Sequence, residues 1–306
     1  MLAELRERDA TGEVAAIYEE IRRFWAVPYV SSLQRHLATR PGWLEWTWAA
    51  LRPVFANGRA QAAAWRAAEG LPIPELPEVS RHALRVWGVT ADGEAAIRAT
   101  CTSFVRVSPA NLMLSGLLRR LLKGDRPAGA PSLASDWTPP PSLGRLPPLV
   151  DLATLPPMEQ AVLATLGTKV GDEPFVPGLY RMLASWPGFL AHVATVLSPH
   201  LHDSVTRAAC RRLLEAVDAE VPAVFAMLSP PSTAIAMPPS GEFADVLAAL
   251  DSYRETSPQM VVFGRMIGES LPAAQGSEPA VSLSGPRFTT RSRSAASPDA
   301  AVPPRW

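Results

Sequence analysis

The chain has 306 residues, 47% of them hydrophobic, and its 29 Lys and Arg residues balance its 29 Asp and Glu residues, giving a formal net charge of zero. Without a basic excess it lacks the electrostatic footprint for nucleic acids and anionic membranes, and we expect it to bind neither. Two cysteines exclude a disulfide scaffold and fit a reducing compartment. We expect no signal peptide, because the chain starts with the charged segment MLAELRERDATGE, and no spanning helix, because no apolar run reaches ~18–20 residues. These features predict a soluble cytoplasmic protein.

Helical periodicity dominates the first half of the chain. A first helix is expected to begin near Thr11, because six apolar side chains recur at helical spacing after it: Val14, Ile17, Tyr18, Ile21, Phe24 and Trp25. Leu33 and Leu37 lie four apart in a second helix, which Pro41-Gly42 ends. Further helices are predicted from Trp43 onward and at Ala60–Ala68, Ala91–Ser103 and Pro109–Leu122, the last with its proline in the first turn.

The second half repeats this character after a proline-rich break. Residues 123–157 lack helical periodicity and are predicted to form an extended linker. Helices are then expected at 158–168, 175–185, 189–199, 203–226, 240–254 and 258–270. Residues 271–306 are poor in apolar side chains, so we expect a disordered tail. No run alternates as a strand would, and the expected fold is all-α, with helical repeats at 1–122 and 158–270.

One segment of the sequence occurs twice. Residues 28–44, PYVSSLQRHLATRPGWL, match residues 174–190, PFVPGLYRMLASWPGFL, at an offset of 146 without a gap. Gly93-Glu94 recurs as Gly241-Glu242, and Ser108-Pro109 as Ser257-Pro258. This period is far longer than the roughly 20–50 residues of solenoid repeats. The pattern predicts a tandem-duplicated helical domain folded as a pseudo-dimer, with a ligand site between the two halves.

The common catalytic signatures are missing. The sequence has no Gly-rich phosphate loop, no HExxH and no GxSxG. His200-Leu201-His202-Asp203 looks like a metal-site fragment, but helical positions two apart face different ways, so we expect helix-end histidines and no metal. Cys101, in apolar surroundings, is predicted to be a buried, inert thiol. The tryptophans are interpreted as core residues: Trp43, Trp46, Trp48 and Trp87.

Polar residues on otherwise apolar helices, or at helix starts, are the candidates for a site: Tyr29, Ser32, Ser108, Asn111 and Tyr253. Arg35 and Arg181 occupy the same position in the two copies. Each can clamp a carboxylate, but a duplicated role in holding a helix end explains both copies better. Asp172 and Glu173, just before the second copy, are more simply helix-start charges than catalytic bases.

The segments TGEVAAIYEEIR, VPYV, RHLATRPGWL and ASWPGFL, together with Tyr253 and the trailing MIGES, resemble the group I 2-haloacid dehalogenases over about residues 10–270. The resemblance implies an all-α pseudo-dimer with a buried site between its halves. It also implies that an aspartate activates a water molecule, which attacks the halogen-bearing C2 directly. It implies no metal and no organic cofactor, and a small carboxylic acid as the substrate.

The chain departs from this family at the residues that carry the chemistry. The family's water-activating aspartate falls at Leu179 when the alignment is anchored on ASWP, and at Pro177 when it is anchored on Pro174. The family's asparagine falls at Ser108, its pocket tryptophan at Tyr29 and its pocket phenylalanine at Ser32, whereas Tyr253 is matched. Neither leucine nor proline can accept a proton, and base catalysis is worth ~10²–10⁴ in rate. The fold therefore carries over more safely than the reaction.

Three functions stay open at this stage. The first is a carbon–halide hydrolase with a displaced base, for which Asp172 and Glu173 are the nearest candidates, and with Phe175 and Leu179 in its substrate-binding wall. The second is an enzyme of another class that reuses the pocket, for example in a biosynthetic pathway. The third is a non-catalytic binding protein. The pocket should be asymmetric, with hydroxyls on one wall and Phe175, Leu179 and Met182 on the other. A homodimer is compatible with the sequence, which does not fix the oligomeric state.

Overall fold

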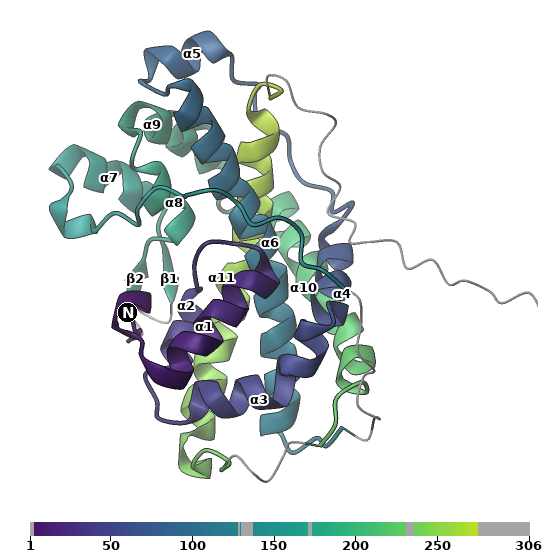
Figure 1. Ribbon diagram of the computed structural model, residues 1–306. Coiled ribbons are helices and arrows are strands. Elements are labelled where there is room, and N and C mark those ends of the chain that lie inside the picture. The colour runs from purple at the N-terminus through teal and green to yellow at the C-terminus, as the bar shows by residue number, and fades with distance from the viewer. Residues whose placement is uncertain (1–2, 128, 130–136, 171–172, 231–235, 275–306) are drawn as a thin grey trace, which may run out of the picture.

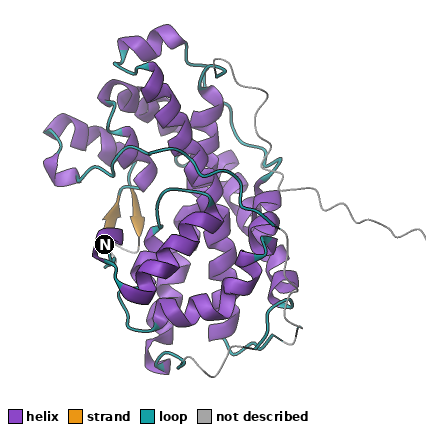
Figure 2. Cartoon of the chain, in the orientation of Figure 1, coloured by secondary structure: helices purple, strands orange, loops and turns teal. Residues whose placement is uncertain are grey.

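The computed structural model describes residues 3–127, 129, 137–170, 173–230 and 236–274. Within these residues the fold is helical, with one short hairpin (Figure 2). The first half contains η1 (Glu7–Asp9), α1 (Gly12–Trp25), α2 (Ser32–Leu37), α3 (Trp43–Ala56), α4 (Arg59–Ala68), α5 (Arg81–Val86) and α6 (Ala91–Leu122). The second half contains η2 (Leu152–Thr154), α7 (Pro157–Thr165), β1 (Thr168–Val170), β2 (Glu173–Phe175), α8 (Gly178–Leu183), α9 (Pro187–Leu197), η3 (Ser198–His200), α10 (Ser204–Phe225), η4 (Ser240–Glu242) and α11 (Phe243–Ser270).

Two long helices, α6 and α11, run side by side through the middle of the molecule and make its most extensive helix pairing (Figure 1). Helix α10 packs on α4 and α6, and α1 packs on α3. Helices α7, α8 and α9 gather at one end, with the hairpin reaching from them toward the N-terminal segment (Figure 1). The predicted fold class, all-α, is confirmed. Helix α8 also begins and ends at the repeat positions that match the ends of α2, although duplication and a pseudo-dimer stay hypotheses.

The long helices correct one prediction. The sequence predicts one helix that ends at Ser103 and another that begins at Pro109, and likewise separate helices at 240–254 and 258–270. The structure instead has continuous helices, with Pro109 inside α6 and Pro258 inside α11. A proline inside a helix removes a hydrogen bond and costs about 3 kcal/mol. Burial offsets that cost here, since both prolines and most of the side chains around them are buried between the helices.

The hairpin corrects a second prediction. No strand was expected, yet β1 and β2 pair antiparallel, with Thr168 opposite Phe175. Strands of three residues are too short to display the alternation by which strands are recognised in a sequence. The helix expected at 175–185 therefore starts later, at Gly178, because Phe175 belongs to β2 and Pro177 is the N-cap of α8. The helix expected at 158–168 ends at Thr165 for the same reason.

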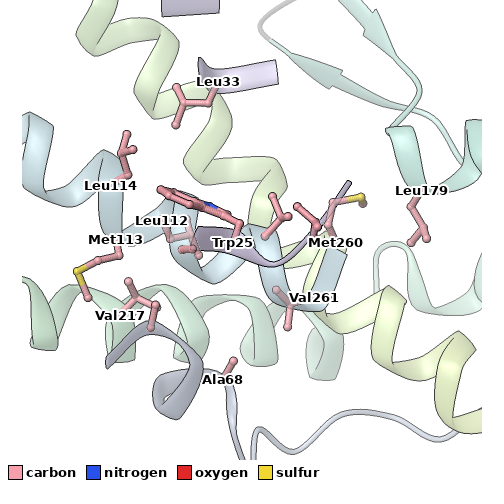
Figure 3. Packing of buried hydrophobic residues seen from close by; sticks show 14 of the residues in the cluster. Trp25, Leu33, Ala68, Leu112, Met113, Leu114, Leu179, Val217, Met260 and Val261 are labelled. Atoms are coloured by element: carbon pink, nitrogen blue, oxygen red, sulfur yellow. The ribbon is translucent and has the colours of Figure 1, made fainter. Parts of the chain in front are cut away.

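The apolar core is continuous from the first helix to the last. Figure 3 shows members of it from both halves, among them Trp25, Leu112, Leu179 and Val261. Trp43, Trp46 and Trp48 are buried, as predicted, whereas Trp87 is half-buried and stacks on His192 with ring centroids 4.4 Å apart. Among the described residues, no helix combines the length and apolar character needed to cross a membrane. Of the tail expected to be disordered, residues 275–306 lie outside the described residues.

Leu179 offers a test of the core. Its side chain is fully buried, so Leu179→Ala should lower the free energy of unfolding by about 2–5 kcal/mol through lost burial and a residual cavity. The measurement is the urea midpoint followed by circular dichroism. The control is Val86→Ala at a side chain that is 83% exposed, which should change stability by no more than about 0.5 kcal/mol. Equal, small effects of both substitutions would contradict the packing.

Candidate functional site

A cavity of about 390 Å³ lies beside the α6–α11 pair and takes its walls from both halves of the chain. The first half contributes Glu7, the segment 28–35 and one face of α6. The second half contributes Phe175, the start of α8 and one face of α11. Residues 145–149 of the linker, the trace that crosses the front of the molecule in Figure 1, complete the lining. The volume is within the range of small-molecule sites, roughly 300–1,000 Å³.

The predicted polar residues of the first half all line this cavity. Tyr29 lies just before α2, Ser32 is the first residue of α2, and Ser108 lies one residue before Pro109 in α6. The Tyr29 hydroxyl is buried, and within the described part of the chain no hydrogen bond of good geometry satisfies it. Burial raises the pKa of this phenol well above its ordinary value, while a contact with the Ser103 hydroxyl acts in the opposite direction, so Tyr29 is a protonated O–H at neutral pH.

Asn111 is held by a network of its own. Its amide oxygen accepts hydrogen bonds from Trp25 Nε1, at 3.2 Å, and from Gln34 Nε2, at 2.8 Å. Its Nδ2 donates to the hydroxyl of Ser31, at 2.8 Å, which in turn donates to Gln34. Both polar ends of Asn111 are therefore engaged by neighbouring side chains. Asn111 lines the cavity as predicted, and it also ties α6 to α1 and α2.

Arg35 and Tyr253 place hydrogen-bond donors in the cavity wall. The Arg35 guanidinium pairs with Glu4 at 2.7 Å and lies 3.4 Å from the Ser32 hydroxyl. Its Nε–H is buried and unpartnered among the described residues. Burial, and then the charge of Glu4, raise the pKa of the half-buried Tyr253, while Arg35 and Ser32 act in the opposite direction. Tyr253 thus stands beside Arg35 as a neutral O–H donor.

Arg181, the second of the two repeated arginines, makes different contacts from Arg35. Arg181 Nε donates to the carbonyl of Val150, at 2.9 Å, and so fixes the end of the linker on α8. Arg181 does not line the cavity, whereas Arg35 does. The expected role of both arginines in holding a helix end stays a prediction, since Arg181 holds the linker and Arg35 pairs with Glu4 of the N-terminal segment. The alternative, a carboxylate clamp, keeps a structural basis at Arg35 alone.

Glu7 is the carboxylate that reaches the cavity among the described residues. One of its oxygens accepts from the backbone N–H of Val30, at 2.8 Å, and the other pairs with Arg22, at 2.6 Å. These contacts keep the Glu7 carboxylate in place. Glu7 was not among the predicted residues, because the 3-10 turn that carries it, η1, lies outside the repeated sequence segments.

On the second-half wall, Phe175 and Met182 line the cavity as expected, but Leu179 does not. Leu179 is buried in the core on another face of the short helix α8 (Figure 3). Its predicted role in substrate binding is therefore wrong. Pro177, the alternative position of the family aspartate, does line the cavity as the N-cap of α8. Positions two apart at a helix start face different ways, which separates the two residues.

The predicted bases are placed only in part. Asp172 lies outside the described residues. Glu173 begins β2, two residues before Phe175, and its side chain belongs to the part of the chain that is not described. Both stay predictions.

The remaining candidates lie away from the cavity. Burial raises the pKa of the Cys101 thiol to about 12, as expected for an unreactive cysteine. His200 Nδ1 lies 2.8 Å from Asp203, which caps α10 by accepting from the Thr206 N–H. Within the described ranges no three His, Cys, Asp or Glu side chains are grouped to hold a metal ion.

Comparisons with known proteins agree on the fold. No family model matches the chain, and no curated protein matches it. Among solved structures, a D-2-haloacid dehalogenase in complex with L-LA aligns with a TM-score of 0.68 and 17% identity, over 88% of this chain and 96% of that one. A mutant D-2-haloacid dehalogenase gives the same values, and a mutant complex with D-2-CPA gives a TM-score of 0.64, with 18% identity, 87% of this chain and 96% of that one. The chain therefore has a haloacid dehalogenase-like fold.

Tyr253→Phe tests the donor role of this hydroxyl. It removes one O–H from the cavity wall while keeping the ring, so affinity for a ligand that accepts this hydrogen bond should fall about three- to tenfold, the equivalent of one hydrogen bond. The thermal midpoint should change little, because the hydroxyl is half-buried at a cavity rather than in the core. Calorimetric titration and a melting curve measure the two quantities. A large loss of stability with unchanged affinity would make Tyr253 a structural residue.

Proposed function

We propose that this protein is a hydrolase that cleaves the carbon–halide bond of a small 2-substituted carboxylic acid in the cavity beside α6 and α11. The observation that carries the proposal is the buried, unpartnered Nε–H of Arg35 on a wall that also holds the Tyr253 and Ser32 hydroxyls. Such donors suit a carboxylate, and the haloacid dehalogenase-like fold supplies the reaction class. Solved proteins of this fold hold small acids, named L-LA and D-2-CPA.

The proposed step is a direct displacement. A water oxygen bonds to C2 as the carbon–halogen bond breaks, and the halide leaves with the bonding electrons. The extra proton of the attacking water passes to a carboxylate, and the products are a 2-hydroxy acid and a halide ion. Glu7 is our candidate for the proton acceptor, because its carboxylate lines the cavity and has lone pairs beyond the two contacts it makes.

The first experiment measures halide release from racemic 2-chloropropionate. Glu7→Gln keeps the size of the side chain and removes the base, so the rate should fall by about 10²–10⁴. Glu20→Gln is the matched control, since Glu20 also pairs with an arginine and accepts from a tryptophan but lies on α1 away from the cavity. Release that is insensitive to EDTA is expected throughout.

Variants Asp172→Asn and Glu173→Gln belong in the same assay. A large loss of rate in one of these variants, with an unchanged rate in Glu7→Gln, would identify that residue as the proton acceptor in place of Glu7. No halide release above the uncatalysed rate from the unmodified protein at high concentration would overturn the hydrolase.

Pro177 allows a gain-of-function test. Asp is a favourable N-cap residue, and Pro177 is the N-cap of α8 at the cavity wall, so Pro177→Asp should fold and bring a second carboxylate to the site. We expect halide release to rise by at least tenfold, within the range of general base catalysis. Pro177→Asn caps the helix without supplying a base and should show no increase. Equal rates in the two variants would exclude Pro177 as the position of the missing aspartate.

A second candidate is a protein that binds such an acid without converting it. It is favoured by the contacts of Glu7 with Arg22 and with the Val30 N–H, because both oxygens of the carboxylate already have a partner. In that case 2-chloropropionate should raise the melting temperature while no halide appears. At 100 times its dissociation constant the ligand would add about 2.7 kcal/mol of stability.

A further inference from the structure

The linker forms one wall of the cavity and is fixed at both ends of that wall. Arg106 Nη1 donates to the Pro141 carbonyl, at 3.0 Å, and the Leu143 N–H donates to the Ala26 carbonyl, at 3.3 Å. At the other end Arg181 holds the Val150 carbonyl. Between these anchors, four residues line the cavity, and we refer to them as the linker wall: Arg145, Leu146, Pro147 and Leu149.

Arg145 supplies the uncompensated charge of the cavity. Three of the described lining residues are charged, and two of them are already paired, Glu7 with Arg22 and Arg35 with Glu4. Arg145 is exposed and makes no ion pair within the described residues. The lining as a whole therefore carries one free positive charge, which lies on the linker wall.

The rest of the cavity is mainly apolar and larger than a three-carbon acid requires. Its hydrophobic lining comes from every wall: Leu33, Phe104, Val107, Leu146, Leu149, Phe175, Met182 and Met260. At ~30 Å³ per water molecule, 390 Å³ corresponds to about 13 waters. A 2-halopropionate fills only a small part of that space and leaves most of the apolar wall in contact with water, which loses the free energy of its burial.

We propose that the cavity binds a monocarboxylic acid with an apolar body longer than three carbons. Arg145 pairs with the carboxylate and so favours a charged acid over a neutral molecule of the same shape. The inference rests on the proposed binding of a carboxylic acid in this cavity. Arg35, neutralised by Glu4, contributes hydrogen bonds, whereas Arg145 contributes charge. The apolar body packs against the side chains of Phe104, Phe175 and Met260.

Binding of unreactive acids tests this choice of ligand by calorimetry on the full chain. In the series propionate, butyrate, hexanoate and octanoate, affinity should rise about two- to fourfold for each added methylene until the cavity is filled. Hexanamide, which lacks the charge, should bind at least tenfold more weakly than hexanoate. Equal affinities for propionate and hexanoate, or no measurable binding of any of these acids at millimolar concentration, would overturn the proposal.

Arg145→Gln tests the charge of Arg145, because it removes the guanidinium and keeps a polar side chain. It should weaken hexanoate about tenfold and leave hexanamide unchanged, because only the carboxylate uses the charge. The matched control is Arg126→Gln at another exposed linker arginine, whose guanidinium donates to the Asp125 carbonyl away from the cavity. Unchanged hexanoate affinity in Arg145→Gln would overturn the role of Arg145.

The outcomes distinguish the two proposals. Binding of hexanoate through Arg145 with no halide released from either 2-chloropropionate or 2-chlorohexanoate would leave this inference standing and contradict the hydrolase. Halide release from 2-chloropropionate, with affinity independent of chain length, would support the hydrolase and contradict this inference.

Discussion

The packing of α6 against α11 is the constraint on which the site depends. Each helix runs through an internal proline, and each proline leaves a carbonyl one turn earlier without its helical partner. The cavity-lining residues of α6, from Phe104 to Asn111, bracket Pro109, and those of α11, from Tyr253 to Met260, bracket Pro258. The cavity therefore lies beside the internal prolines of both central helices, which remain continuous there. Burial of the helices against each other offsets the lost backbone hydrogen bonds, so the core and the site share residues.

Two of the three charged side chains that line the cavity are paired across chain segments. Glu4 and Glu7 come from the N-terminal segment and meet Arg35 in α2 and Arg22 in α1. Each pair neutralises a group that would be costly to bury alone. For the proposed chemistry this means that Arg35 offers a hydrogen-bond donor more than a charge, and that Glu7 is an anchored carboxylate.

The sequence predicted what depends on periodicity and missed what depends on tertiary contact. Amphipathic spacing located α1, helix propensity located α4, and the repeat drew attention to Tyr29, Ser32 and Phe175, which meet at one cavity. The breaks expected before Pro109 and Pro258 are absent, because local rules for proline give no weight to burial between two helices. Leu179 was misplaced because a residue's face in a helix of six residues depends on where the helix starts. Glu7 and Arg145 were missed because they lie outside the regular, repeated segments.

The linker shows how an irregular segment becomes part of a site. Residues 137–150 have no regular secondary structure, so their backbone groups must be satisfied by solvent or by other parts of the chain. The contacts of Pro141, Leu143 and Val150 with the body do this at the two ends and leave the middle as a wall. Because residues 145–149 lie outside the helical core, substitutions there alter the charge and shape of the cavity at little cost to packing. In the proposed function the helices position the acid, and the linker is the part of the wall best able to determine which acid binds.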